Sequence, residues 1–200
     1  MSVEVRGSVI RLDVGSFEEL VGERPAGHEA FTVPGVAEAI GAVRDPAAHL
    51  DLDVAGPGLV QHHRVWVDHE MAAFLLGVRD DEHQLLAVPP ALLGAGLARV
   101  LRLGPRAVGP REPRAVADDL LEDLFHDDEM RRRSAYAGLD AHLAWNLGLF
   151  WPEGRRWFSV VDGPSGLWWV EGDEGARVLT PTTATEVWRV LSSLLALVPD

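Results

Sequence analysis

The sequence of 200 residues contains no cysteine and no lysine. Without cysteine, the chain can form no disulfide bond, thiolate catalyst or cysteine-based zinc or iron–sulfur site. Without lysine, arginine supplies all 18 basic residues, a bias that is typical of a very GC-rich genome such as that of an actinobacterium. The fold must therefore be held together by packing, and a hydrophobic content of 47% is enough for a substantial core.

Positive charge is scarce, and long hydrophobic runs are missing. The 18 basic residues stand against 31 acidic ones, which gives a formal net charge of -13. Nucleic acid and anionic membrane surfaces would repel such a chain, so a neutral or basic protein is the partner that we expect. No run approaches the length of a bilayer span, and Met1–Leu12 lacks the apolar stretch of a secretory signal. We therefore predict a cytoplasmic protein without membrane insertion.

Signatures of nucleotide binding and of serine hydrolysis are also absent. The sequence has no Walker or Rossmann glycine pattern, and none of its serines lies in the Gly-x-Ser-x-Gly context of a nucleophile elbow. The segment Gly163-Pro164-Ser165-Gly166 favours a hairpin turn instead. We therefore predict a protein that is not an enzyme and binds no cofactor.

One group of histidines is a candidate metal site. It consists of His62, His63, His69 and Glu70, whose side chains suit zinc or nickel. If residues 64–67 form a strand, His62 and His63 point to opposite faces, while the other two residues lie beyond its end. We therefore predict no metal site, and a metal-dependent enzyme that uses these four residues is the alternative from a different functional class.

Two acidic clusters favour solvated helix faces over catalytic sites. His126-Asp127-Asp128-Glu129 is followed directly by Met130-Arg131-Arg132-Arg133, which predicts a helix end with local ion pairs. The second cluster is predicted to be one solvated helix face, and its members are Asp118, Asp119, Glu122 and Asp123.

Two stretches of the chain carry the same order of three strands and one helix. In the first, strands are predicted at Arg64–Val67, Ala72–Val78 and Gln84–Val88, with a helix from Pro89 to Leu103. In the second, strands are predicted at Trp157–Val161, Leu167–Glu171 and Arg177–Thr180, with a helix from Ala184 to Leu197. The offset of about 93 residues exceeds the period of solenoid repeats, roughly 20–50 residues. We predict a duplication with half-repeats at about 60–105 and 155–198, and a convergent ordering of common elements is the alternative.

Further elements surround these half-repeats. A hairpin at the edge of a sheet is predicted from Val3–Arg6 and Val9–Leu12, with its turn at Gly7-Ser8. Helices are predicted at Pro34–Val43, Ala115–Phe125 and Ala135–Phe150, and residues 104–113 are predicted to be a linker. The resulting fold class is α+β, in which duplicated, quasi-twofold β-β-β-α units form a central antiparallel sheet with packed helices.

The seven tryptophans carry the strongest signal for binding. Trp168 and Trp169 are adjacent on a predicted strand and must face opposite sides, so each side of that strand needs a cover. The cover is either a helix layer of the same chain or a partner, and tryptophan is enriched where partners bind. From strand position, the predicted partner-binding residues are Trp66, Phe74, Trp157 and Trp168.

Several hydrophobic motifs resemble those of a known family. They are Arg64-Val65-Trp66-Val67-Asp68-His69-Glu70, Phe74–Val78, Gln84–Pro89, Arg102-Leu103-Gly104-Pro105-Arg106, Gly166-Leu167-Trp168-Trp169-Val170 and Val178-Leu179-Thr180-Pro181. Together they cover about half of the chain, which on these motifs resembles the EspG-like chaperones of actinobacterial type VII (ESX) secretion systems. The chain is shorter than typical members, and its region through Val54 matches no motif of the family.

The resemblance implies a single EspG-like domain over residues 1–200 with a quasi-twofold fold. It also implies a cytosolic chaperone that covers the apolar helical tip of a secreted effector of the PE/PPE or WXG type, without nucleotide or metal. An immunity protein or inhibitor remains the alternative within the class of binding proteins, because a small acidic domain suits the neutralisation of a basic toxin.

Overall fold

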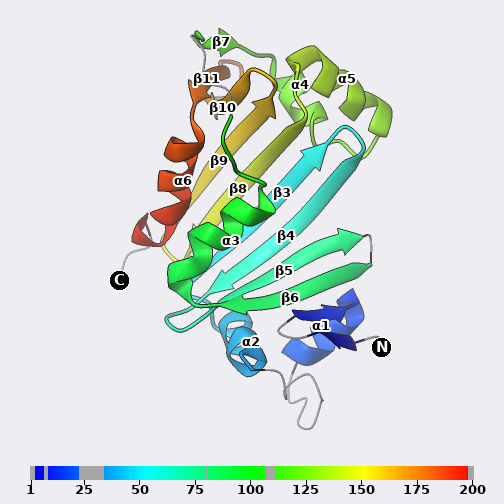
Figure 1. Cartoon of the computed structure of the whole chain (residues 1–200), viewed down its shortest axis with the longest axis vertical. Coiled ribbons are helices and arrows are strands. Elements are labelled where there is room, and N and C mark those ends of the chain that lie inside the picture. The colour runs from blue at the N-terminus through cyan, green and yellow to red at the C-terminus, as the bar shows by residue number, and fades with distance from the viewer. Residues whose placement is uncertain (1–2, 7–8, 23–33, 80, 107–110, 198–200) are drawn as a thin grey trace. The chain divides into compact units, whose positions relative to one another are not determined.

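The computed structural model describes residues 3–6, 9–22, 34–79, 81–106 and 111–197. These residues form an α+β fold with a large antiparallel sheet (Figure 1), as the sequence predicts. Backbone hydrogen bonds join the strands in the order β1-β2-β6-β5-β4-β3-β8-β9-β10-β11-β7. The chain divides into two compact units: unit 1 comprises Met1–Asp51, Gln61–Leu93 and Leu149–Arg155, and unit 2 comprises Leu52–Val60, Gly94–Gly148 and Arg156–Asp200.

The elements of the first half of the chain begin with a hairpin. In chain order they are β1 (Val3–Arg6), β2 (Val9–Leu12), α1 (Val14–Val21), α2 (Val36–Arg44), β3 (Ala48–Gly56), β4 (Leu59–Val67), β5 (Ala72–Arg79), β6 (Glu82–Val88), the 3-10 turn η2 (Pro90–Leu92) and α3 (Leu93–Val100). The predicted hairpin is confirmed by the antiparallel pairing of β1 with β2, and its turn at Gly7-Ser8 lies outside the described residues. The helix predicted at Pro34–Val43 is confirmed as α2.

The second half of the chain begins with a very short strand. In chain order its elements are β7 (Arg114–Ala115), α4 (Asp118–Asp123), α5 (Glu129–Leu139), β8 (Leu143–Trp151), β9 (Gly154–Gly163), β10 (Gly166–Glu171), β11 (Val178–Thr182), α6 (Ala184–Ser192) and the 3-10 turn η3 (Leu194–Leu197). In the predicted linker, residues 104–106 and 111–113 form neither helix nor strand.

The predicted order of elements recurs in the two halves. β4, β5 and β6 pair antiparallel in succession and lead into η2 and α3. β9, β10 and β11 also pair antiparallel in succession and lead into α6. Both segments are therefore three-stranded meanders followed by a helix.

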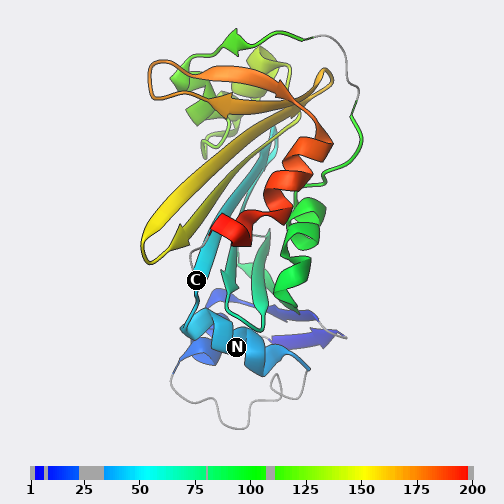
Figure 2. The same ribbon diagram turned by 90° about the vertical axis from the view of Figure 1, so that its left-hand side faces the viewer.

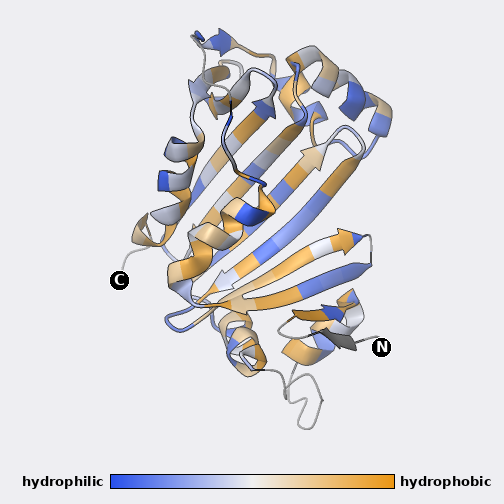
Figure 3. Cartoon of the chain, viewed as in Figure 1, coloured by the Kyte–Doolittle hydropathy of each residue, from blue (hydrophilic) through white to orange (hydrophobic). Residues whose placement is uncertain are grey.

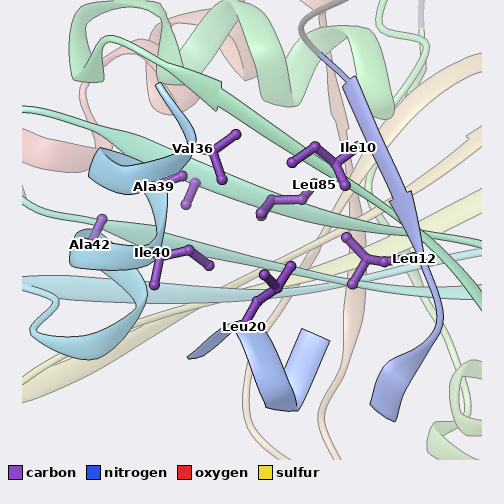
Figure 4. Packing of buried hydrophobic residues seen from close by; sticks show 9 residues of the cluster. Ile10, Leu12, Leu20, Val36, Ala39, Ile40, Ala42 and Leu85 are labelled. Atoms are coloured by element: carbon purple, nitrogen blue, oxygen red, sulfur yellow. The ribbon is translucent and has the colours of Figure 1, made fainter. Parts of the chain in front are cut away.

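Unit 1 has its own hydrophobic core. Figure 4 shows Ile10 and Leu12 of β2, Leu20 of α1, Ile40 of α2 and Leu85 of β6, and all five are nearly inaccessible to solvent. The side chains of α1 and α2 thus cover one side of the strands β2 and β6. Burial of this apolar surface is the main stabilising contribution in unit 1.

Unit 2 has a second core, in which α4 and α5 pack on the strands (Figure 2). Leu124 and Leu139 contact the cluster that contains Val161, Trp168 and Leu179 of β9, β10 and β11. Polar anchors fix α5 in place: the Tyr136 hydroxyl donates to the Ala55 carbonyl at 2.5 Å, and Arg132 Nε donates to the Gly56 carbonyl at 3.2 Å.

The helix predicted at Ala135–Phe150 is wrong. α5 ends at Leu139 because Asp140 takes left-handed backbone angles, φ 52° and ψ 47°, and the chain then enters strand β8. Residues on both faces of β8 are buried, so its sequence is a nearly continuous apolar run that periodicity cannot distinguish from a buried helix.

Strand β3 was not predicted, although its sequence carries a clear signal. Buried and partly exposed residues alternate from Ala48 to Val54, and Figure 3 shows hydrophobic and hydrophilic bands following one another along the strands. Such alternation is the pattern of a strand with one face on the core.

A candidate partner-binding groove in unit 2

A hollow within unit 2 lies between α4 and the strands β8, β9 and β10. Its volume is about 380 Å³. Ligand pockets in proteins typically measure about 300–1,000 Å³, so the hollow has room for several side chains of a partner. We call it the α4 groove.

The floor of the α4 groove is one face of the sheet. Ala144 and Asn146 of β8, Ser159 and Val161 of β9 and Val170 of β10 line it. Residues two positions apart on a strand share a face, so Ala144 and Asn146 point the same way, as do Ser159 and Val161. Val161 is paired with Trp168, which lies two positions before Val170 and therefore shares its face.

The wall of the α4 groove is apolar. Leu121, Leu124 and Phe125 recur at helical spacing and bring their side chains to one side of α4 and of the turn that follows it. All three belong to the core cluster of unit 2 or pack against it. The wall is therefore held in position by the core.

The rim of the groove carries three carboxylates, Asp118, Glu122 and Glu174, and one guanidinium, Arg177. Asp118 Oδ2 accepts a hydrogen bond from the Gly175 amide, whereas Asp118 Oδ1 is buried and has no hydrogen-bond donor among the described residues. The two glutamates form no ion pair with any other described residue. The rim therefore has a surplus of negative charge.

The sequence predicted the acidic side of α4 but not the groove. Asp118, Asp119, Glu122 and Asp123 were predicted to be one solvated face, yet Asp118 and Glu122 line the groove and Asp123 pairs with Arg131. The run of leucines and acidic residues in α4 indicates a helix with one apolar and one acidic side. The run alone does not reveal which strands lie opposite, because those strands follow α4 only after α5.

The four predicted partner-binding residues differ in exposure. Trp157 on β9 is 55% exposed and lies two positions before Ser159, so it stands on the face of β9 that forms the groove floor. Trp66 on β4 is partly buried and stacks on Phe17 of α1, with ring centroids 5.6 Å apart.

Phe74 and Trp168 are corrected to core residues. Phe74 on β5 is 3% exposed and Trp168 on β10 is 7% exposed, so neither is accessible to a partner in this structure. The Trp168 ring has the guanidinium carbons of Arg111 and Arg114 at 4.9 and 5.1 Å from its centroid, and its Nε1 donates to Ser165 Oγ. Residues of the chain itself therefore cover this face of β10.

His63 and Glu70, two members of the group weighed as a candidate metal site, lie in different surroundings. His63 is buried on β4, where its Nδ1 accepts a hydrogen bond from the Gly77 amide at 3.1 Å. Glu70 lies in a turn that Asp68 closes by accepting the amides of Glu70 and Met71. Within the described ranges, no three histidine or acidic side chains gather as metal ligands would.

The acidic cluster His126–Glu129 is a helix end, as predicted. The Asp128 carboxylate caps α5 by accepting the amides of Met130 and Arg131. These two hydrogen bonds hold the pKa of Asp128 below its usual value, and the bond from Met130 has the larger effect. Local ion pairs complete the end, because Arg131 pairs with Asp123 and Arg133 pairs with Glu129.

Comparison with known proteins identifies the fold. No protein-family model and no curated protein matches the sequence. The structure is similar to that of the Mycobacterium tuberculosis type VII secretion system chaperone EspG5, solved in complex with a PE25–PPE41 dimer. The similarity has a TM-score of 0.58 at 14% sequence identity and covers 96% of this chain and 97% of that chain. Among the described residues, no helix has the length and hydropathy needed to span a membrane.

Proposed function

We propose that this chain is a secretion-associated chaperone of a type VII system, which acts by binding and not by catalysis. Its client is an apolar helical segment of a secreted effector of the PE/PPE or WXG type, which it binds in the cytoplasm. The observation that carries the proposal is the shared fold, which extends over almost the full length of both this chain and a chaperone solved in complex with a PE25–PPE41 dimer.

The α4 groove supports the proposal on physical grounds. A chaperone for an apolar helix must offer an apolar surface that remains soluble when no client is bound. The groove has apolar residues such as Leu121 and Phe125 below a rim of charged side chains, in a chain of net charge -13. An amphipathic helix that places its apolar face in such a groove is a common mode of recognition.

Trp157 is the aromatic contact that we propose. Of the four residues predicted from strand position, Phe74 and Trp168 are buried and Trp66 is partly buried. Trp157 is the exposed one, so we retain it alone as a direct contact. Its large exposed ring lies on the groove face of β9, where a partner could remove it from water.

Affinity purification of the tagged chain from its native host, followed by mass spectrometry, tests the proposal. We expect the wild-type chain to recover a secreted helical protein and Trp157→Ala to recover less of it, with Trp188→Ala, which removes an exposed tryptophan of α6, as the matched control. Recovery of metabolic enzymes alone would contradict the proposal. Recovery of a basic toxin would replace it with an immunity function.

A further inference from the structure

The charges around the α4 groove are not balanced. Three carboxylates line it against the single guanidinium of Arg177, and no ion pair joins Arg177 to any of the three. Some acidic side chains elsewhere in unit 2 do have close cationic partners: Asp162 is paired with Arg106 at 2.7 Å, and Glu129 is paired with Arg133. The groove therefore retains negative charge that the described residues do not neutralise.

This surplus charge lies beside apolar surface, where it acts more strongly than in open water. The low-dielectric wall of Leu121, Leu124 and Phe125 displaces solvent from one side of Glu122. An occupant that covers the groove also removes water from the rim. It must then supply a positive charge, because desolvating an unpaired carboxylate costs free energy.

The floor also presents polar groups that the other described residues leave without a side-chain hydrogen bond. The Asn146 amide and the Ser159 hydroxyl line the groove, and neither forms a side-chain hydrogen bond with another described residue. The buried Asp118 Oδ1 likewise has no donor within the described part of the chain. A cationic side chain with several N–H donors matches this set of acceptors.

We propose that the α4 groove binds an apolar helical segment whose apolar stripe ends in an arginine or lysine. The apolar side chains of this segment lie against Leu121, Phe125 and Val170, the partly exposed apolar residues of the groove. Its cation lies at the rim between Glu122 and Glu174. This inference names the chemistry of the client segment and rests on the proposed chaperone function. It excludes clients whose contacting segment is acidic, because their charge would meet the same rim.

Peptide binding to the full chain tests the inference. The probe is a capped helical peptide of about 15 residues, near the minimum length for an isolated helix. It carries a leucine and phenylalanine stripe that ends in arginine, and two matched peptides carry glutamine or glutamate at that position. By fluorescence anisotropy we expect the arginine peptide to bind about fivefold tighter than the glutamine peptide, and the glutamate peptide to bind most weakly.

Two double variants that change the net charge equally distinguish the effect of the rim carboxylates from the effect of the overall charge. Glu122→Gln with Glu174→Gln should abolish the preference for arginine. Glu112→Gln with Asp127→Asn removes two exposed acids outside the groove and should retain it. All four positions are on the surface or in turns, so the fold should survive, and circular dichroism checks this.

Three results would overturn the inference: no peptide binds, the three peptides bind alike, or the rim variant keeps the preference of the wild type. The two proposals fail separately. If affinity purification recovers a secreted helical protein but the peptides show no preference, only the chemistry of the groove is wrong. If arginine is preferred but no such protein is recovered, the chaperone function is wrong and the groove remains a site for basic helices.

Discussion

At the scale of single residues, Trp157 and Trp168 have opposite surroundings. Trp157→Ala removes an exposed ring, so we expect the fold to be retained and the affinity for the client to fall at least tenfold, or about 1.4 kcal/mol. Trp168→Ala leaves a cavity among core residues and should cost about 3–5 kcal/mol of unfolding free energy. Urea denaturation and client titration measure both effects. A folded Trp157→Ala variant with normal affinity would show that this ring is not a contact.

Tyr136 provides a prediction for the dependence of stability on pH. Burial raises the pKa of its hydroxyl well above the ordinary value of about 10, chiefly through desolvation. The folded state therefore keeps Tyr136 neutral, whereas the unfolded chain ionises it above about pH 10. Its contribution is fully present below that pH and is lost as the pH rises further, so the free energy of unfolding should fall there.

The amino-acid composition allows an alkaline change in stability to be attributed to this one side chain. Tyr136 is the only tyrosine, and cysteine and lysine are absent, so no other side chain has an ordinary pKa near 10. We expect Tyr136→Phe to abolish the alkaline slope of the unfolding free energy, although it loses the hydrogen bond to the Ala55 carbonyl. Ultraviolet titration of the folded protein should show no phenolate near pH 10. An ordinary titration would contradict the buried placement.

The sequence alone could not assign the tryptophan faces. Strand alternation shows that Trp168 and Trp169 point to opposite sides, but it does not show which side the helices cover. That choice depends on Arg111 and Arg114, which reach the Trp168 ring from a segment more than fifty positions earlier. Local patterns carry no information about such contacts.

At the scale of elements, helix α5 ends at a residue with unfavourable backbone geometry. Asp140 has φ 52°, a left-handed conformation that glycine adopts without strain. We expect Asp140→Gly to raise the free energy of unfolding by about 0.5–1 kcal/mol and the β-branched Asp140→Val to lower it by about 1–2 kcal/mol. Urea denaturation of both variants tests the pair. A loss of stability in Asp140→Gly would mean that the carboxylate itself contributes to this turn.

Element type could be predicted wherever one face of the element is exposed. α2 has buried residues at helical spacing, and the sequence predicts it correctly. In β8 both faces are buried, so the strand lacks the alternation that marks its type. The α4 groove could not be predicted at all, because its wall and its floor come from segments separated by α5.

At the scale of the whole molecule, we propose that the two half-repeats, at about 60–105 and 155–198, arose by duplication. Each contains an antiparallel three-stranded meander followed by a helix. We expect a crystal structure to superpose residues 64–103 on 157–197 about a pseudo-twofold axis. If the helices of the two segments do not superpose when their strands do, the duplication is contradicted and the shared order of elements is a coincidence.

The fold could be predicted further than the function. The order and length of the elements are enough to predict an α+β fold with an antiparallel sheet, since both can be inferred from local hydrophobic patterns. The client is different, because its identity depends on a few exposed side chains such as Trp157, Glu122 and Glu174. At 14% identity to the chaperone of similar fold, these contacts cannot be transferred from that protein.

The solubility of the client recovered from the host, when it is co-expressed with this chain, tests the central claim most directly. A chaperone that covers an apolar helix must keep its client in solution. We predict that the client is insoluble when expressed alone, soluble with the wild-type chain, and largely insoluble with Trp157→Ala at equal expression. A client that is equally soluble with and without this chain would contradict the account.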